Sequence, residues 1–176
     1  DITDCDITQR AKKGIAYAFQ QPVRFKGITI QELLELAAGK ELSYTELCDL
    51  LGKVGLCARE YINRELDSGL SGGEMKRVEI ASVLARNAKV TIFDEPEAGI
   101  DLWSFTKLVE TFQELRNQQN GLLLIISHQE RILEIADEIV VIAKGKIRTV
   151  GSKDEVLPQL LSGEISKKCP RGKENQ

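Results

Sequence analysis

The stretch from Leu70 to Glu95, LSGGEMKRVEIASVLARNAKVTIFDE, decides the fold class because a helix in it leads into an apolar strand. Ser71 and Glu74 form a capping-box pair, which predicts a helix from about Gly72 to Asn87. The strand that follows, Val90 to Phe93, ends in two adjacent carboxylates. A helix followed by a short apolar strand is the repeating unit of a layered α/β fold.

The same alternation continues on both sides of this stretch. Further strands are predicted at Ile15–Phe19, Leu122–Ser127, Glu138–Ala143 and Lys146–Val150, and further helices at Leu102–Gln118, Glu130–Ile135 and after Ser152. The run Leu122–Ser127 is continuously apolar, as buried parallel strands are. Helical spacing from Thr29 to about Ala58 predicts a small helical subdomain, at about residues 28–88, inserted between two parts of a largely parallel sheet. We therefore expect one α/β domain over residues 1–161 and a polar tail at residues 162–176.

Length and composition indicate a globular chain. The 176 residues are 42% hydrophobic and 29% charged, enough to build a core. A net charge of -3 argues against direct binding of nucleic acid. No apolar run is long enough to span a bilayer, so we expect any membrane link to come through a partner.

The cysteines point to a reducing compartment. Cys5, Cys48, Cys57 and Cys169 show no zinc-ligand spacing. Cys48 and Cys57 stand among apolar residues, which predicts small buried side chains. With no disulfide framework or export signal, we expect a cytoplasmic location.

The LSGGE loop (Leu70–Glu74) admits two interpretations. Ser71 and Glu74 alone explain it as a helix cap. The same geometry also favours anion binding, because Gly72 and Gly73 leave backbone amides uncovered at a helix N-terminus. Such a loop can bind a phosphate without a lysine.

Three further side chains stand at predicted strand ends. Asp94 is suited to hold Mg²⁺, and Glu95 to orient or deprotonate an attacking water; a solvated acidic turn is the alternative. His128, the single histidine, follows the strand that ends at Ser127, where an imidazole can hydrogen-bond a phosphate or play a purely structural part. Gln20, after the first strand, is uninformative by itself.

Together, AFQQP, LSGGE, IFDEPEAGID and IISHQ resemble, in this order, the motifs of an ABC-type ATPase domain, and the similarity runs from Asp1 to about Leu161. The resemblance implies a P-loop NTPase-like sheet with the ABC helical subdomain, an ATPase activity, and ATP and Mg²⁺ as ligands. It identifies Gln20 with the Q-loop glutamine that also reaches the metal, and Ser71, Gly72, Gly73 and Glu74 with the nucleotide-binding signature loop. Asp94 matches the Walker B metal ligand, Glu95 the catalytic glutamate, His128 the switch histidine and Asp101 the D-loop aspartate.

Within that family, two stretches are most similar to the Suf-type iron–sulfur cluster assembly ATPase. They are the AFQ-x-P segment from Ala18 to Gly27 and the segment from His128 to Leu133, whereas Pro96 is more typical of transporter ATPases. The resemblance implies a second ATPase subunit as partner. It also implies a Suf-like scaffold or a membrane permease that docks near the loop after Gln20.

The phosphate-gripping sequence GxxxxGK followed by Ser or Thr does not occur in the chain. The Gly-Lys pairs at Gly39, Gly52, Gly145 and Gly172 are not followed by Ser or Thr. We expect a truncated domain with an incomplete sheet core that binds ATP weakly alone, because it lacks most donors to the β- and γ-phosphates.

Two other classes compete with a transporter-type or Suf-type ATPase. Chromosome-maintenance and repair ATPases carry similar motifs, but they place long heptad coiled coils before the signature, and none precedes Ser71 here. A non-catalytic subunit that only donates its signature loop would have no use for Glu95 and His128.

Overall fold

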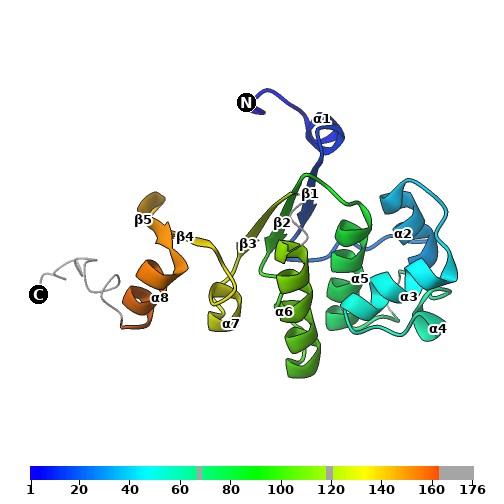
Figure 1. Cartoon of the computed structure of the whole chain (residues 1–176). Helices are drawn as coiled ribbons and strands as arrows, with labels where there is room; N and C mark the ends of the chain where they lie inside the picture. The colour runs from blue at the N-terminus through cyan, green and yellow to red at the C-terminus, as the bar shows by residue number, and fades with distance from the viewer. Residues whose placement is uncertain (67–68, 118–120, 163–176) are drawn as a thin grey trace, which may run out of the picture. The chain divides into compact units, whose positions relative to one another are not determined.

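The computed structural model describes residues 1–66, 69–117 and 121–162, in two compact units (Figure 1). The first unit spans Asp1–Ser127, and the second begins at His128. The first contains a parallel sheet in the order β1-β2-β3, built from Ile15–Ala18, Val90–Asp94 and Leu122–Ile126. The predicted α/β fold with a parallel sheet is confirmed.

Four helices lie between β1 and β2 in the chain: α2 (Ile30–Ala38), α3 (Tyr44–Lys53), α4 (Ala58–Tyr61) and α5 (Gly72–Ala85). Capping boxes at Thr29 and Ser43 start α2 and α3, as the sequence indicates. Figure 1 shows α2, α3 and α4 grouped beside α5, and α2 and α3 both pack on α5. Helices α2, α3 and α5 contribute fully buried aliphatic side chains: Ile30, Leu34, Leu47, Leu51, Val78 and Ile80.

Only one face of the parallel sheet is covered by helices in the described part of the first unit. Phe93 of β2 packs on Phe112 of α6 (Leu102–Asn117), with ring centroids 5.0 Å apart. On the opposite face of β3, Leu122 is 61% and Leu124 43% exposed. The prediction of a fully buried third strand is therefore wrong, because its side chains alternate between a covered and an open face.

The second unit contains α7 (Glu130–Leu133), β4 (Glu138–Ala143), β5 (Lys146–Ser152) and α8 (Lys153–Leu161). β4 and β5 pair antiparallel through a two-residue turn at Lys144 and Gly145, whose φ angles of 52° and 70° fit a type I′ turn. The predicted hairpin and final helix are confirmed, although β5 runs two residues further than expected. Ile139, Val156 and Leu157 form the core of this unit.

Several smaller expectations differ from the structure. Helix α1 (Ile7–Lys12), capped by Asp6 and Gln9, was not predicted. Cys57 is exposed and Cys48 half-buried, so the expectation of two buried cysteines is wrong. Gln118, Cys169 and the tail residues 163–176 lie outside the described residues, and the domain bounds stay predictions. No helix in the described ranges is long and apolar enough to cross a membrane.

Candidate functional site

The carboxyl ends of β1 and β2 bring three predicted site residues together. Parallel pairing sets Ala18 beside Phe93, so the residues that follow emerge at one edge of the sheet. There, Gln20 Nε2 donates a 2.6 Å hydrogen bond to Glu95 Oε2. Asp94 is the last residue of β2 and directly precedes Glu95. The structure thus joins residues that are far apart in sequence into one polar cluster.

Glu95 occupies an unusual backbone conformation at this edge. Its φ is 44°, in the left-handed region that costs a residue with a Cβ about 1–2 kcal/mol. Two backbone hydrogen bonds hold the turn: Glu95 N–H donates to Ile126 O at 2.9 Å, and Ala98 N–H donates to Glu95 O at 3.0 Å. Strain of this kind concentrates at functional sites, although nothing in the residue pattern predicted it.

Tyr17 is a member of the cluster that sequence reasoning missed. Its hydroxyl donates a 2.8 Å hydrogen bond to Asp94 Oδ2, and that bond raises the pKa of Tyr17. The register pairs Tyr17 with Ile92, two residues before Asp94, so Tyr17 and Asp94 lie on the same face of the sheet. A hydroxyl in the otherwise apolar strand IAYA was the available signal.

The donor set of this cluster fits a magnesium ion with a nucleotide phosphate. Mg²⁺ takes hard oxygen ligands and usually keeps one or two protein ligands beside waters and phosphates. Asp94 offers carboxylate oxygens, and Gln20 offers Oε1 because its Nε2 already donates to Glu95. No group of three His, Cys, Asp or Glu side chains capable of holding a metal occurs within the described residues.

The LSGGE loop starts α5 with a complete capping box. Ser71 Oγ accepts the Glu74 N–H at 3.2 Å, and the Glu74 carboxylate accepts the Ser71 N–H at 2.7 Å. Hydrogen bonds from Ser71 and from the Tyr61 hydroxyl lower the pKa of Glu74 to about 2. The first-turn amides that this box does not use belong to Gly72 and Gly73.

Gly73 also marks a close contact with the loop after β2. A Cβ at this position would lie 2.6 Å from the carbonyl oxygen of Gly99. The same carbonyl belongs to the segment that ends at Asp101, so the LSGGE loop and this segment lie against each other. A small residue at position 73 is therefore a requirement of packing.

Asp101 caps α6 in the structure. Its carboxylate accepts the backbone N–H groups of Trp103 and Ser104 at 3.1 and 3.0 Å and the Ser104 hydroxyl at 2.7 Å, and the Ser104 hydrogen bonds lower the pKa of Asp101. Arg77 of α5 donates to Ser104 Oγ at 2.9 Å and to Gly73 O at 3.3 Å. These contacts tie the Asp101 cap to the LSGGE helix.

His128 is the first residue of the second unit. Its Nε2 lies 3.5 Å from Gln129 Nε2, an amide nitrogen that can only donate, so the two atoms form a hydrogen bond in the tautomer that leaves His128 Nε2 unprotonated. Its expected part beside Glu95 stays a prediction.

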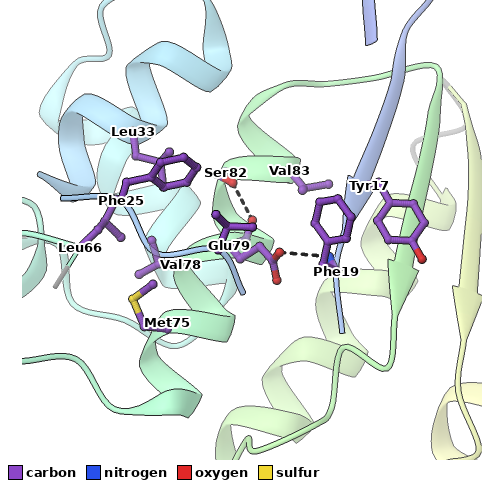
Figure 2. A pocket seen from close by; sticks show the side chains of 11 residues that line it. Tyr17, Phe19, Phe25, Leu33, Leu66, Met75, Val78, Glu79, Ser82 and Val83 are labelled. Carbon is purple, nitrogen blue, oxygen red and sulfur yellow. Dashed lines mark hydrogen bonds between the residues drawn. The ribbon is translucent and has the colours of Figure 1, made fainter. Parts of the chain in front are cut away.

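A cavity of about 180 Å³ lies beside the loop that follows Gln20 (Figure 2). Aromatic and aliphatic side chains of β1, this loop, α2 and α5 line it, with Glu79 and Ser82 as the polar members. The lining residues are Tyr17, Phe19, Val23, Phe25, Leu33, Leu66, Met75, Val78, Glu79, Ser82 and Val83.

Comparison with known proteins shows which family this chain resembles. The sequence model of the ABC transporter family matches residues 1–98. An uncharacterized ABC transporter ATP-binding protein of Methanocaldococcus jannaschii is 36% identical over 98% of this chain and 72% of its own length. The lipopolysaccharide export system ATP-binding protein LptB of Haemophilus influenzae is 31% identical over 89% of this chain and 66% of its own. The chain thus spans about two thirds of the length of these relatives.

Solved structures agree on the fold. The ATP-binding subunit of an ABC transporter superposes with a TM-score of 0.75 over 95% of this chain and 72% of that chain, at 24% identity. A dimeric ATP-binding cassette in a post-hydrolysis state with ADP and Pi superposes with a TM-score of 0.73 over 85% of this chain and 68% of that chain, at 22% identity. The chain belongs to the ABC transporter family as an ATP-binding cassette domain.

Proposed function

We propose that this chain supplies the hydrolytic carboxylates and the signature loop of an ATPase whose active site forms between two subunits. The observation that carries the proposal is the 2.6 Å contact between Gln20 and Glu95 at the edge of the sheet, beside Asp94. Family membership makes ATP the substrate to expect. The dimeric cassette among the structural neighbours supports the two-subunit arrangement.

In this proposal Glu95 acts as the general base. Its carboxylate orients a water and accepts the water's proton, while the oxygen of that water attacks the γ-phosphorus and ADP leaves. Asp94 and the Oε1 atom of Gln20 hold Mg²⁺, which neutralises charge on the phosphate oxygens when it is bound. The family resemblance further implies that His128 hydrogen-bonds the γ-phosphate.

The LSGGE loop serves the nucleotide of the opposite subunit. The amides of Gly72 and Gly73 and the hydroxyl of Ser71 stand at the N-terminus of a 14-residue helix, where an anion is favoured. The Glu74 carboxylate keeps the loop in shape rather than facing the phosphate, since both its oxygens accept hydrogen bonds from Tyr61 and Ser71. Asp101 holds the neighbouring segment by capping α6.

The motion of this ATPase is passed to a partner protein that docks at the cavity beside Gln20 (Figure 2). A membrane permease is the first candidate, because the relatives include the ATP-binding protein of a lipopolysaccharide export system and the "Probable ATP-dependent transporter ycf16" of Antithamnion sp., 29% identical. An iron–sulfur assembly scaffold is the second, on the Suf-like residues Ala18–Gly27 and His128–Leu133. Both readings favour a cytoplasmic protein.

The test is the Mg²⁺ dependence of ATP hydrolysis in a cassette that joins this chain to a segment with the GxxxxGK[ST] sequence, called a Walker A segment below. Asp94→Asn removes a charged oxygen ligand, so the Mg²⁺ concentration that gives half-maximal turnover should rise at least tenfold. Glu110→Asn, a change at an exposed carboxylate on α6, is the control and should leave the curve unchanged. If turnover depends on the Mg²⁺ concentration in the same way in Asp94→Asn and in the unmodified cassette, Asp94 is not a ligand of the metal.

A further inference from the structure

Lys76 of α5 is the most deeply buried charged side chain in the described residues, at 1% exposure. Its ammonium group donates to the carbonyl oxygens of Phe19, of Gln20 at 3.3 Å and of Asp94 at 3.3 Å. A lysine is costly to bury unless hydrogen bonds and an ion pair compensate it. Here the compensation comes from the backbone on both sides of the Gln20–Glu95 contact.

Glu79, one helical turn later, completes the arrangement. One of its carboxylate oxygens accepts the Phe19 N–H at 3.0 Å, and the other lies 3.5 Å from Lys76 Nζ. Burial raises the pKa of Glu79, while Lys76 opposes that shift. Phe19 therefore has both of its backbone polar groups held by side chains of α5, as Figure 2 shows for the N–H.

These contacts attach three parts of the proposed site to one helix. The N-terminus of α5 carries Gly72 and Gly73, and its next turns hold the carbonyls of Gln20 and Asp94 through Lys76. An apolar pair of similar volume often matches a buried ion pair in stability, but it offers no hydrogen bonds to the backbone groups that Lys76 and Glu79 hold. The charged groups of Lys76 and Glu79 hold the backbone of Phe19, Gln20 and Asp94 in a fixed position.

We propose that Lys76 and Glu79 are positioning residues that fasten Phe19, Gln20 and the end of β2 to α5, so that a movement of the signature helix moves Gln20 together with it. This inference rests on the proposed function for its effect on turnover. The attachment itself can be tested without nucleotide.

The decisive variant is Lys76→Met with Glu79→Met, which replaces the pair by apolar side chains of similar length. We expect exchange of the Phe19 amide hydrogen at least tenfold faster, by more than any fall in the urea midpoint explains, because its N–H and the nearby carbonyl oxygens lose their partners. The control replaces Lys107 and Glu110 by Met on α6, an exposed pair with the same spacing, and should leave Phe19 exchange unchanged. Unchanged Phe19 exchange in a folded Lys76/Glu79 variant would overturn the proposal.

Glu79→Leu decides the matter if the double variant does not fold, because it removes the acceptor of the Phe19 N–H and leaves Lys76 in place. At least threefold faster exchange of the Phe19 amide would support the attachment, and an unchanged rate would refute it.

The effect of the attachment on catalysis is tested by measuring ATP turnover in the cassette joined to a Walker A segment. The Met pair should lower kcat at least tenfold, while the control pair on α6 leaves it unchanged. Glu95→Gln in the same cassette separates the two ideas. Loss of turnover in Glu95→Gln with full kcat in the Met pair would refute the positioning role alone, whereas full turnover in Glu95→Gln would refute the proposed function.

Discussion

Gly73→Ala tests the contact between the LSGGE loop and the segment after β2. The added Cβ would stand 2.6 Å from the carbonyl oxygen of Gly99, which is 0.8 Å inside the 3.4 Å at which ordinary contact begins. The obstacle is backbone, so it cannot rotate away as a long side chain can. Gly72→Ala is a matched control, since a Cβ at that position meets nothing within 4 Å.

Both variants gain helix propensity, but only Gly73→Ala also creates a steric clash. Ala in place of Gly stabilises a helix by up to about 1 kcal/mol, and both residues lie in the first turn of α5. Forcing a methyl group into a packed contact costs about 1–3 kcal/mol. The helix effect largely cancels in the comparison, so the free energy of unfolding of Gly73→Ala should lie about 1–3 kcal/mol below that of Gly72→Ala.

Urea unfolding followed by far-UV circular dichroism measures this difference, with equal slopes for the two variants as the check that only stability has changed. Gly72→Ala should be as stable as the unmodified chain or more so. Equal urea midpoints for the two alanine variants would refute the close contact between Gly73 and Gly99.

Three further outcomes follow from the site. Tyr17→Phe removes the hydrogen bond to the Asp94 carboxylate and should lower the free energy of unfolding by about 1 kcal/mol in urea unfolding; no loss would show that the bond contributes nothing. The Glu74 pKa of about 2 lies below its ordinary 4.5, so the stabilising contribution of this carboxylate is present above about pH 4.5 and lost as the pH falls toward 2. Urea midpoints of the unmodified chain and Glu74→Gln should therefore differ at pH 7 and converge near pH 2, and a gap that does not change with pH would contradict this. Calorimetric titration of the 176-residue chain with ATP should give no micromolar binding, because its sequence has no GxxxxGK[ST] loop; a micromolar Kd would overturn that expectation.

Local signals in the sequence predicted most of the elements correctly. The Ser43–Glu46 and Ser71–Glu74 pairs mark helix starts because their hydrogen bonds form within four residues. The hairpin at Lys144–Gly145 followed from its turn residues in the same way. The apolar run of β3 correctly predicted a strand. It did not predict that one face of this strand is exposed, because the helices that cover a sheet face come from distant parts of the chain.

In the candidate site, too, some residues could be found from the sequence, whereas others are apparent only from contacts in the folded chain. Asp94 and Glu95 were chosen as candidates because they stand at a strand end, and Gln20 because of the family resemblance. Pairing between parallel strands then brings the three side chains together. Lys76 and Tyr17 were missed because their importance lies in contacts with residues far away in the chain. From the sequence, a lysine on a helix is expected to be exposed. The structure instead places three carbonyl oxygens around the ammonium group of Lys76.

The role of Glu95 as the general base is tested by the ATP turnover and the subunit association of Glu95→Gln in the cassette joined to a segment that contains GxxxxGK[ST]. Turnover should be at least 100-fold lower, and an ATP-dependent dimer should persist in light scattering because bound ATP is not hydrolysed. Glu110→Gln should match the unmodified cassette in both respects. Turnover at the unmodified rate in Glu95→Gln would contradict the assignment of Glu95 as the base, and with it the proposed hydrolytic site.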